Sequence, residues 1–516
     1  MDDESRYRAV CSRDSRFDGE FFFAVRTTGI YCRPSCPATT PLRRNVRFYP
    51  SAAAAQHEGF RACKRCRPDA VPGSAAWHVR ADAVARAMRL IADGVVDREG
   101  VDGLADRLGY STRQLRRQLT AEVGAGPVAL ARAQRAQTAR VLLQTTGLPV
   151  TEIAFAAGFA SVRQFNDTIR KIYETTPGAL RDTGPGPASR GRGTAASGGR
   201  GSATSGGREL AALGDRGSSA SNGHGPAAFG GRGIALRLAY RGPYAARQIF
   251  DFLARRAVAG VEEVEGEAGS RVYRRTLRLP GGPGIAAVHE ADGGRGWLDC
   301  TMELTEVRDL TAATQRIRRQ FDLDADPGAV TERFAADPAL GPEAAKAPGL
   351  RAPGSSDPHE GAFRAILGQQ VTVAAARNHA AALVAARGAP LPEPSGGLTH
   401  LFPDAETLAE ASLEELKMPR ARRGALRALA AALAEGGLVL DAGADRDEAE
   451  KGLLSLPGIG PWTAAYIRMR ALGDPDVLPP GDVALRQALA RKGDPDTVAW
   501  SPWRSYATHL LWNSLD

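Results

Sequence analysis

At 516 residues the chain is too long for one hydrophobic core, so several domains are expected. Six cysteines are too few for a disulfide scaffold, and no apolar run could span a bilayer. The charged start of the chain has no apolar core of a signal peptide. These three observations favour a soluble cytoplasmic protein. The first 180 residues carry the entire net charge of +9 and the remainder is neutral, so the N-terminal third has the electrostatic character of a nucleic-acid binder.

Four cysteines near the N-terminus have the spacing of metal ligands. Cys32 and Cys36 form one close pair, Cys63 and Cys66 form another, and a longer loop separates the pairs. Two such pairs can surround one tetrahedral Zn²⁺, which keeps its thiol ligands deprotonated. Spacing alone also fits a closed zinc site in which all four cysteines only hold the fold.

The residues around these cysteines resemble the N-terminal domain of the Ada adaptive-response proteins. The matching segments are Asp-Gly-Glu-Phe-Phe-Phe-Ala-Val-Arg-Thr-Thr-Gly-Ile-Tyr-Cys-Arg-Pro-Ser-Cys at residues 18–36 and Gly-Phe-Arg-Ala-Cys-Lys-Arg-Cys at residues 59–66. The resemblance implies that Cys32 accepts a methyl group from a methylphosphotriester in the DNA backbone, with zinc both structural and thiolate-activating. An exposed sulfur is expected there, with Arg33, Lys64, Arg65 and Arg67 offsetting the negative charge.

A weak internal repeat follows, in which each copy reads as helix, glycine turn, Ser/Thr cap and second helix. Leu115 and Leu119 in one copy, and Phe165, Ile169 and Ile172 in the other, are expected to form the buried stripe of the second helices. The polar positions predicted to face DNA are Arg113, Gln114, Arg116, Arg163, Gln164 and Asn166. The paired arrangement resembles the AraC-type DNA-binding domain, which implies binding of promoter DNA through successive major grooves and contact with RNA polymerase.

Residues 182–231 are rich in Gly, Ser and Ala, with scattered Arg, and cannot bury enough apolar surface to fold. A flexible coil of that length has a root-mean-square span of roughly 40 Å. We therefore expect two modules on a flexible tether and not one rigid body.

Beyond this linker, residues 232–312 alternate apolar and polar positions as strands do, with a helix near residues 245–258, and predict a small α+β domain. Residues 313–516 are rich in Ala, Leu and Arg at helical spacing and predict an all-helical domain.

The string Leu-Pro-Gly-Ile-Gly at residues 456–460 resembles a helix-hairpin-helix motif, in which Gly458, Ile459 and Gly460 bring backbone N–H groups to a DNA phosphate. Asp482 follows at the position of the catalytic aspartate of the helix-hairpin-helix glycosylases. With matching segments at residues 363–371 and 502–512, residues 232–516 resemble AlkA-type 3-methyladenine DNA glycosylases.

That resemblance implies a pocket for a base flipped out of duplex DNA. Aromatic faces would stack on the alkylated base and attract its positive charge, and Asp482 would stabilise the oxocarbenium-like sugar. The candidates for the pocket are Phe252, Trp462, Tyr466 and Trp512.

Several positions depart from family patterns. Trp462 stands where strand-cutting members carry a Schiff-base lysine, so a monofunctional enzyme is expected. Gln370 replaces an apolar wedge, Gly481 replaces a second acid, and Val483 stands where an aromatic residue can line the pocket, which leaves the substrate range open. The Pro-Cys-His-Arg motif of O6-methylguanine transferases is also missing, so that activity is not predicted.

The complete prediction is a multidomain alkylation-damage protein that senses backbone methylation, activates transcription, and excises 3-methyladenine and 7-methylguanine from double-stranded DNA, with no membrane partner and a nucleoid-associated location. The predicted order is a small α+β zinc domain (1–75), an all-α double helix-turn-helix domain (76–181), a disordered linker (182–231), a small α+β domain (232–312) and an all-α helix-hairpin-helix glycosylase domain (313–516). One alternative is a zinc-containing AraC-type regulator with an inactive C-terminal domain. A second alternative keeps the enzyme but makes Cys32 purely structural.

Overall fold

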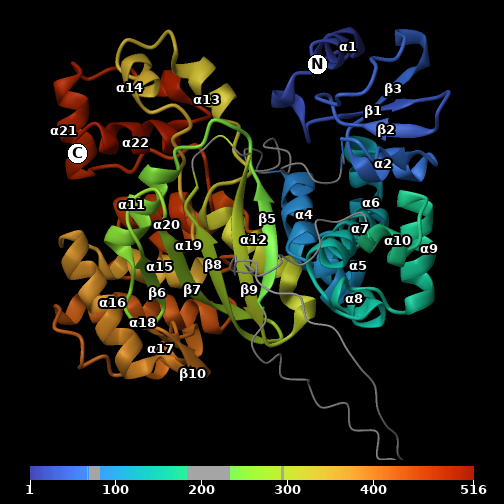
Figure 1. Ribbon diagram of the computed structural model, residues 1–516. Coiled ribbons are helices and arrows are strands. Elements are labelled where there is room, and N and C mark those ends of the chain that lie inside the picture. The colour runs from blue at the N-terminus through green and yellow to red at the C-terminus, as the bar shows by residue number, and fades with distance from the viewer. Residues whose placement is uncertain (67, 69–81, 183–232, 292–293, 295, 516) are drawn as a thin grey trace, which may run out of the picture.

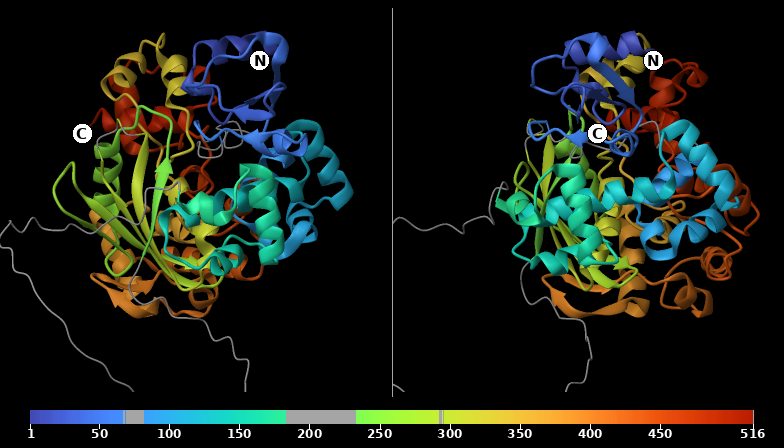
Figure 2. Two further views of the ribbon diagram at one scale, coloured as in Figure 1. Left: turned by 45° about the vertical axis from the view of Figure 1, so that its right-hand side comes forward. Right: turned by 90° about the vertical axis from the view of Figure 1, so that its right-hand side faces the viewer.

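The structure is a computed structural model, and it describes residues 1–66, 68, 82–182, 233–291, 294 and 296–515. The predicted linker lies outside the described residues apart from residue 182. Figure 1 shows the arrangement of the described parts, and Figure 2 gives two turned views.

The N-terminal region is a small four-stranded sheet with two short helices. The strand order is β3-β1-β2-β4, with β2 and β4 parallel and the other neighbours antiparallel. Its elements are α1 (Asp3–Cys11), β1 (Phe22–Val25), β2 (Ile30–Cys32), β3 (Val46–Tyr49), α2 (Ala52–His57) and β4 (Arg61–Ala62). Cys32 is the last residue of β2, and the second cysteine pair follows β4, so the parallel pairing of β2 with β4 brings the two cysteine pairs together.

Among the described residues, seven helices form the region of residues 83–182 and contain the predicted repeat. Its elements are α4 (Ala83–Ala92), α5 (Val95–Leu108), α6 (Thr112–Val123), α7 (Pro127–Thr145), α8 (Val150–Ala156), α9 (Val162–Tyr173) and α10 (Pro177–Asp182). Ser111 and Ser161 cap α6 and α9, because each hydroxyl accepts a hydrogen bond from the backbone N–H three residues later. The predicted apolar stripes are confirmed, since every member of both stripes is buried.

The second half begins with a five-stranded antiparallel sheet in the order β5-β9-β8-β7-β6. Its strands are β5 (Ile234–Ala239), β6 (Glu262–Glu265), β7 (Val272–Leu279), β8 (Gly282–His289) and β9 (Trp297–Leu304), with α11 (Ala246–Arg256) between the first two. This arrangement confirms the predicted small α+β region and its helix.

The remaining residues are mainly helical. The helices are α12 (Leu310–Gln320), α13 (Pro327–Phe334), α14 (Gly341–Lys346), α15 (Pro358–Leu367), α16 (Val373–Arg387), α17 (Ala405–Glu410), α18 (Arg420–Ala434), α19 (Arg446–Leu454), α20 (Pro461–Arg470), α21 (Val483–Arg491) and α22 (Arg504–Asn513). The prediction of an all-helical region is wrong at a hairpin of β10 (Ala389–Ser395) and β11 (Leu398–Leu401). Three prolines in β10 weaken the strand signal in the sequence, and an edge strand tolerates them.

The two halves pack against each other, so the expectation of two separate modules on a tether is wrong for the described residues. The helix α7 packs against β5 and α4 packs against α12, and the turned views keep the helix-turn-helix region against the sheet, with α9 on the outer side (Figures 1 and 2). One hydrophobic cluster continues from Ala139 and Ile153 of α7 and α8 into Leu238 of β5 and Leu310 of α12. Polar contacts also cross the boundary at Arg86–Gly443, Arg89–Ala442, Arg107–Asp441, Asp93–Arg319 and Asp18–Arg241.

Candidate functional sites

The four N-terminal cysteines form one compact cluster. Their Sγ atoms all lie within 4.8 Å of one another. Zn–S bonds of about 2.3 Å arranged as a tetrahedron put the sulfurs about 3.8 Å apart, so this cluster needs only a small contraction around a Zn²⁺ ion. The donor set and its geometry therefore fit zinc.

A buried carboxylate supports the loop between Cys32 and Cys36. Asp18 accepts hydrogen bonds from the backbone N–H of Ser35 at 3.0 Å and from its hydroxyl at 2.6 Å, and it forms an ion pair with Arg33 at 3.1 Å. Burial raises the pKa of Asp18 above its ordinary value, against the lowering effect of these partners. The backbone oxygen of Asp18 accepts from Nη2 of Arg241 at 2.7 Å, so the metal-binding loop is tied to the second half of the chain.

Cys32 is less accessible than expected. It is 5% exposed, and the other three cysteines are also buried, so the expectation of an exposed sulfur is wrong for this conformation. The reason is packing, because Phe21, Phe23 and Val46 close over the cluster. Lys64 and Arg65 are exposed beside it, whereas Arg67 lies outside the described residues.

The predicted DNA-reading positions lie on the second helix of each motif. Arg113 and Arg116 on α6 and Arg163 on α9 are exposed, and Gln114 and Asn166 are half-buried. Gln164 is also exposed, and its Oε1 accepts from the backbone N–H of Ala160 at 3.3 Å.

The helix α9 also touches the zinc region. Arg163 and Lys171 line a cavity of about 380 Å³ with Phe60 of the N-terminal region. Arg61 of β4, two residues before Cys63, forms an ion pair with Glu174 at the end of α9. The strand that leads to Cys63 and one predicted DNA-reading helix are therefore in direct contact.

The predicted hairpin joins α19 to α20. Gly458 has φ of +81°, and a Cβ there would lie 2.7 Å from Cβ of Ala425, so both backbone conformation and space favour glycine. Gly460 precedes α20 and has open space around its Cα. The side chain of Ile459 is buried, and its backbone N–H donates to the backbone oxygen of Leu456 at 3.3 Å. Its side chain packs in the core and is not available for DNA.

Two glutamines follow α15 at the rim of a second, larger cavity. Gln369, which the sequence did not single out, donates from Nε2 to the backbone oxygen of Gly458 at 3.0 Å and to Oγ1 of Thr463 at 2.9 Å. Gln370 is exposed, has φ of +55° and lines the cavity. The first glutamine anchors the hairpin, and the second projects beside the opening.

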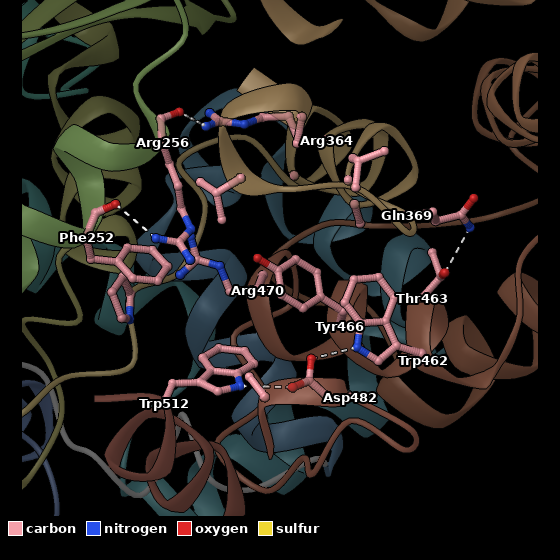
Figure 3. A pocket seen from close by; sticks show the side chains of 18 of the residues that line it. Phe252, Arg256, Arg364, Gln369, Trp462, Thr463, Tyr466, Arg470, Asp482 and Trp512 are labelled. Carbon is pink, nitrogen blue, oxygen red and sulfur yellow. Dashed lines mark hydrogen bonds between the residues drawn. The ribbon is translucent and has the colours of Figure 1, made fainter. Parts of the chain in front are cut away.

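Asp482 lies between two tryptophans in this cavity of about 1590 Å³ (Figure 3). Its Oδ2 accepts from Nε1 of Trp462 at 2.9 Å, and its Oδ1 accepts from Nε1 of Trp512 at 3.1 Å. Oδ1 also accepts from the backbone N–H of Leu485 at 2.8 Å, so the same carboxylate caps α21. Three donors from three helices thus fix the orientation of this carboxylate.

The structure places the four predicted pocket aromatics around one cavity. Trp462 and Tyr466 stack with ring centroids 5.1 Å apart, and Tyr466 lies 6.4 Å from Trp512. Phe252 of α11 lines the same cavity from the opposite side (Figure 3). Val483 is 70% exposed and lies at the rim of the cavity.

Three polar residues of the pocket were not predicted. The guanidinium carbons of Arg256 and Arg470 lie 3.7 and 4.6 Å from the ring centroid of Phe252. The ring of His509 lies 5.1 Å from that of Trp512. Each is one helical turn from a predicted aromatic residue, so the three- or four-residue spacing in the sequence was a signal that could have identified them.

Three family profiles match the chain. They describe the metal binding domain of Ada over residues 5–69, a helix-turn-helix domain over residues 104–183, and the AlkA N-terminal domain over residues 235–357.

Among curated relatives, the "Probable bifunctional transcriptional activator/DNA repair enzyme AlkA" of Mycobacterium tuberculosis is 51% identical over 100% of this chain and 97% of its own length. Two Escherichia coli proteins match different parts of the chain. "Bifunctional transcriptional activator/DNA repair enzyme Ada" is 41% identical over 34% of this chain and 47% of its own length, and "DNA-3-methyladenine glycosylase 2" is 33% identical over 53% of this chain and 95% of its own length.

The fold and these sites define a fusion of an Ada-type zinc and helix-turn-helix protein with an AlkA-type helix-hairpin-helix protein. Its full-length relative shares half of all residues over nearly its whole length, so the two have the same architecture from end to end. The chain belongs to this family of bifunctional Ada–AlkA proteins.

Proposed function

We propose that the second half excises alkylated purines, 3-methyladenine and 7-methylguanine, from double-stranded DNA. The observation that carries this proposal is the carboxylate of Asp482, held between the indoles of Trp462 and Trp512 at the floor of an aromatic cavity. A flipped base stacks on the aromatic faces, and its C1′–N bond breaks as the base leaves with the electron pair. The carboxylate faces the positive sugar, water adds its oxygen to C1′, and a proton passes to Asp482 and then to solvent.

The enzyme leaves an abasic site and does not cut the strand. Strand cleavage by this chemistry needs an amine that forms a Schiff base with C1′. Trp462 occupies the position after the hairpin, and its indole nitrogen donates to Asp482. Gly458 and Gly460 present backbone N–H groups to a phosphate, and Gln370 enters the gap that the flipped base leaves.

The first half senses damage on the DNA backbone. Cys32, Cys36, Cys63 and Cys66 would hold one zinc ion, which would keep their sulfurs deprotonated and nucleophilic. Sγ of Cys32 takes the methyl carbon of a methylphosphotriester, so an S–C bond forms, a C–O bond breaks, and a phosphodiester anion is restored. The transfer happens once per molecule because the resulting thioether is stable. Because Cys32 is 5% exposed, DNA must shift the covering side chains before the transfer.

The methylated protein acts as a transcriptional activator. A thioether carries no negative charge, so the surface next to DNA becomes more positive and its affinity for the backbone rises, most steeply at low salt. Contact between β4 and α9 carries this change to the DNA-reading face, which then holds promoter DNA near RNA polymerase. We assign residues 1–75 to the zinc domain and residues 76–181 to the promoter-binding domain. Residues 182–231 are the linker, and residues 232–312 and 313–516 are the two glycosylase domains. We place the protein at the nucleoid.

Base release from methylated duplex DNA by the wild type and by Asp482→Asn tests the enzyme. Release by the wild type alone supports the proposal. Release by neither folded protein would instead favour the alternative, a regulator with an inactive C-terminal domain.

Mass spectrometry of the Cys32 peptide after incubation with methylated DNA tests the sensor, because a gain of one CH₂ unit is expected. An unchanged mass would make Cys32 a purely structural ligand.

A further inference from the structure

We propose that Arg241 is a positioning residue that joins the cysteine cluster of the first half to α22, the helix that carries Trp512, so that zinc binding at the cluster and the order of the base pocket are coupled. The inference rests on the proposed glycosylase function and adds a means of control to it. Arg241 is not among the residues that line the cavity around Asp482, so it acts through the residues between the two sites.

Arg241 is a buried cation at the boundary between the two halves. It follows β5 and is 5% exposed. Its Nη2 donates to the backbone oxygen of Asp18 at 2.7 Å and forms an ion pair with Glu20 at 3.4 Å. Its Nη1 donates to the backbone oxygen of Asp324 at 3.0 Å. One guanidinium therefore holds a segment of the zinc region against a loop of the second half, and a buried charge that lost either side would be destabilised.

The segment that Arg241 holds also supports the metal-binding loop. The carboxylate of Asp18 accepts hydrogen bonds from the backbone N–H and the hydroxyl of Ser35, which lies between Cys32 and Cys36. The backbone oxygen of the same aspartate accepts from Arg241. Because one residue bonds to the loop with its side chain and to the arginine with its backbone, ordering the loop around an ion also fixes the acceptor of Arg241.

A second buried arginine continues the contact toward α22. Arg351 is 2% exposed, and its Nη2 donates to the backbone oxygen of Arg241 and, at 3.0 Å, to that of Pro243. Its Nη1 donates to the backbone oxygen of Asp322 at 3.3 Å. The carboxylate of Asp322 accepts from the phenol of Tyr506 in α22 at 2.9 Å. A continuous series of hydrogen bonds thus leads from the loop after β5 to α22.

The helix α22 presents Trp512 to the carboxylate of the base pocket. Tyr506 and Trp512 belong to the same ten-residue helix, and Nε1 of Trp512 donates to Oδ1 of Asp482 at 3.1 Å (Figure 3). A shift of α22 therefore moves a donor that orients the carboxylate. Misplacement of a catalytic group by about 1 Å can slow a reaction by roughly a hundredfold, so small changes in the position of this helix matter.

The coupling acts in both directions, because linkage between two sites is reciprocal. Its two-state element is the segment of residues 18–20, which Arg241 holds in this structure and which can also be released. Removal of zinc loosens the loop that Asp18 supports, and Arg241 then loses a fixed acceptor. In the opposite direction, a chain without the guanidinium cannot hold the segment and binds zinc more weakly.

The test compares the full-length protein with zinc and after removal of zinc by a chelator. Arg241→Met removes the guanidinium, Arg241→Lys keeps one cationic donor, and Tyr506→Phe removes only the hydroxyl at the far end of the series. The matched control is Arg237→Met, which alters an arginine of β5 whose side chain is 61% exposed. The readouts are hydrogen exchange of residues 504–513 by mass spectrometry, zinc affinity by chelator competition, and single-turnover base release from methylated duplex DNA. Circular dichroism establishes that each variant is folded.

In the wild type and in Arg237→Met, removal of zinc should speed hydrogen exchange in α22 by about tenfold or more, the effect of one lost hydrogen bond to a charged group. Base release should slow to a similar extent, and exchange in α18 should not change. Arg241→Met should bind zinc about tenfold more weakly and show fast exchange in α22 even with zinc, and Arg241→Lys should recover part of both losses. Tyr506→Phe should keep its zinc affinity within about twofold, whereas exchange in α22 should no longer respond to zinc.

Three results would overturn the inference while leaving the enzyme in place. They are equal exchange of α22 with and without zinc in the wild type, unchanged zinc affinity in folded Arg241→Met, and a full response of α22 to zinc in Tyr506→Phe. The last result decides the question even if Arg241→Met does not fold. Lack of base release by the folded, zinc-loaded wild type would instead refute the proposed function, and the exchange and affinity measurements would still decide the coupling.

Discussion

Arg89 of α4 donates a hydrogen bond from Nε to the backbone oxygen of Ala442, 353 residues further along the chain, at 2.7 Å. The arginine is 8% exposed, and burial lowers its pKa to about 9. Ala442 belongs to the loop before α19, the first helix of the hairpin motif. The helix-turn-helix region and the hairpin region are therefore held in one docked arrangement.

The docked arrangement should depend on glycine at position 443. A Cβ at Gly443 would lie 2.4 Å from Cδ1 of Leu90, and the backbone there needs no glycine conformation. Gly443→Ala should therefore lower the free energy of unfolding by about 1–3 kcal/mol through overpacking, and small-angle scattering should show a larger radius of gyration. Gly437→Ala is the control, because its nearest contact is 3.6 Å away. Equal radii and equal stability for the two variants would mean that the halves are not docked in solution.

The docking of the two halves could not be predicted, because the residues at their contact look like ordinary surface residues in the sequence. The helix α4 has an ordinary amphipathic pattern, and the partner loop, Asp-Ala-Gly-Ala-Asp at residues 441–445, reads as a surface turn. The long polar linker between the halves suggested independence. The decisive features are a close approach of Gly443 to Leu90 and arginine donors aimed at backbone oxygens, and both depend on tertiary packing.

The individual sites were more predictable than their surroundings. The cysteines, the serine caps and the glycine turn of the hairpin have local causes, so spacing and residue type identified them. The polar side of the base pocket was missed, although Phe252 and Arg256 are four residues apart on α11, as are Tyr466 and Arg470 on α20. An arginine on a helix is usually solvated, and only the packing of α11, α20 and α22 around one cavity shows that these are not.

The indole N–H of Trp512 should matter separately from its aromatic face. Trp512→Phe keeps an aromatic ring but removes the 3.1 Å hydrogen bond to Oδ1 of Asp482. A hydrogen bond to a charged group contributes about 1.5–3 kcal/mol, so base release in single turnover should slow by about tenfold or more. Trp503→Phe, which alters the residue before α22 and leaves the Asp482 contacts intact, should stay within about twofold. Equal rates for Trp512→Phe and the wild type would show that the carboxylate needs no orientation from this indole.

Zinc content should follow the cysteine cluster. Cys36→Ser removes one of four sulfurs that lie within 4.8 Å of one another, so the protein should lose most of its bound zinc after dialysis and the N-terminal region should unfold at a lower temperature. Cys11→Ser is the control, because Cys11 is exposed and lies outside the cluster. Atomic absorption and calorimetry give the two readouts. Full zinc retention by Cys36→Ser would exclude Cys36 as a ligand.

Tyr466 should report the charge of the base pocket directly. Burial alone would raise the pKa of its phenol, but Arg470 and then Arg256 favour the phenolate and lower the pKa below 10. Arg470→Met removes the larger of these attractions while burial remains, so the pKa of Tyr466 should rise. The measurement is tyrosinate absorbance against pH, with Tyr466→Phe subtracted to isolate this residue. A Tyr466 pKa that does not move in Arg470→Met would mean that solvent or an anion already neutralises the guanidinium of Arg470.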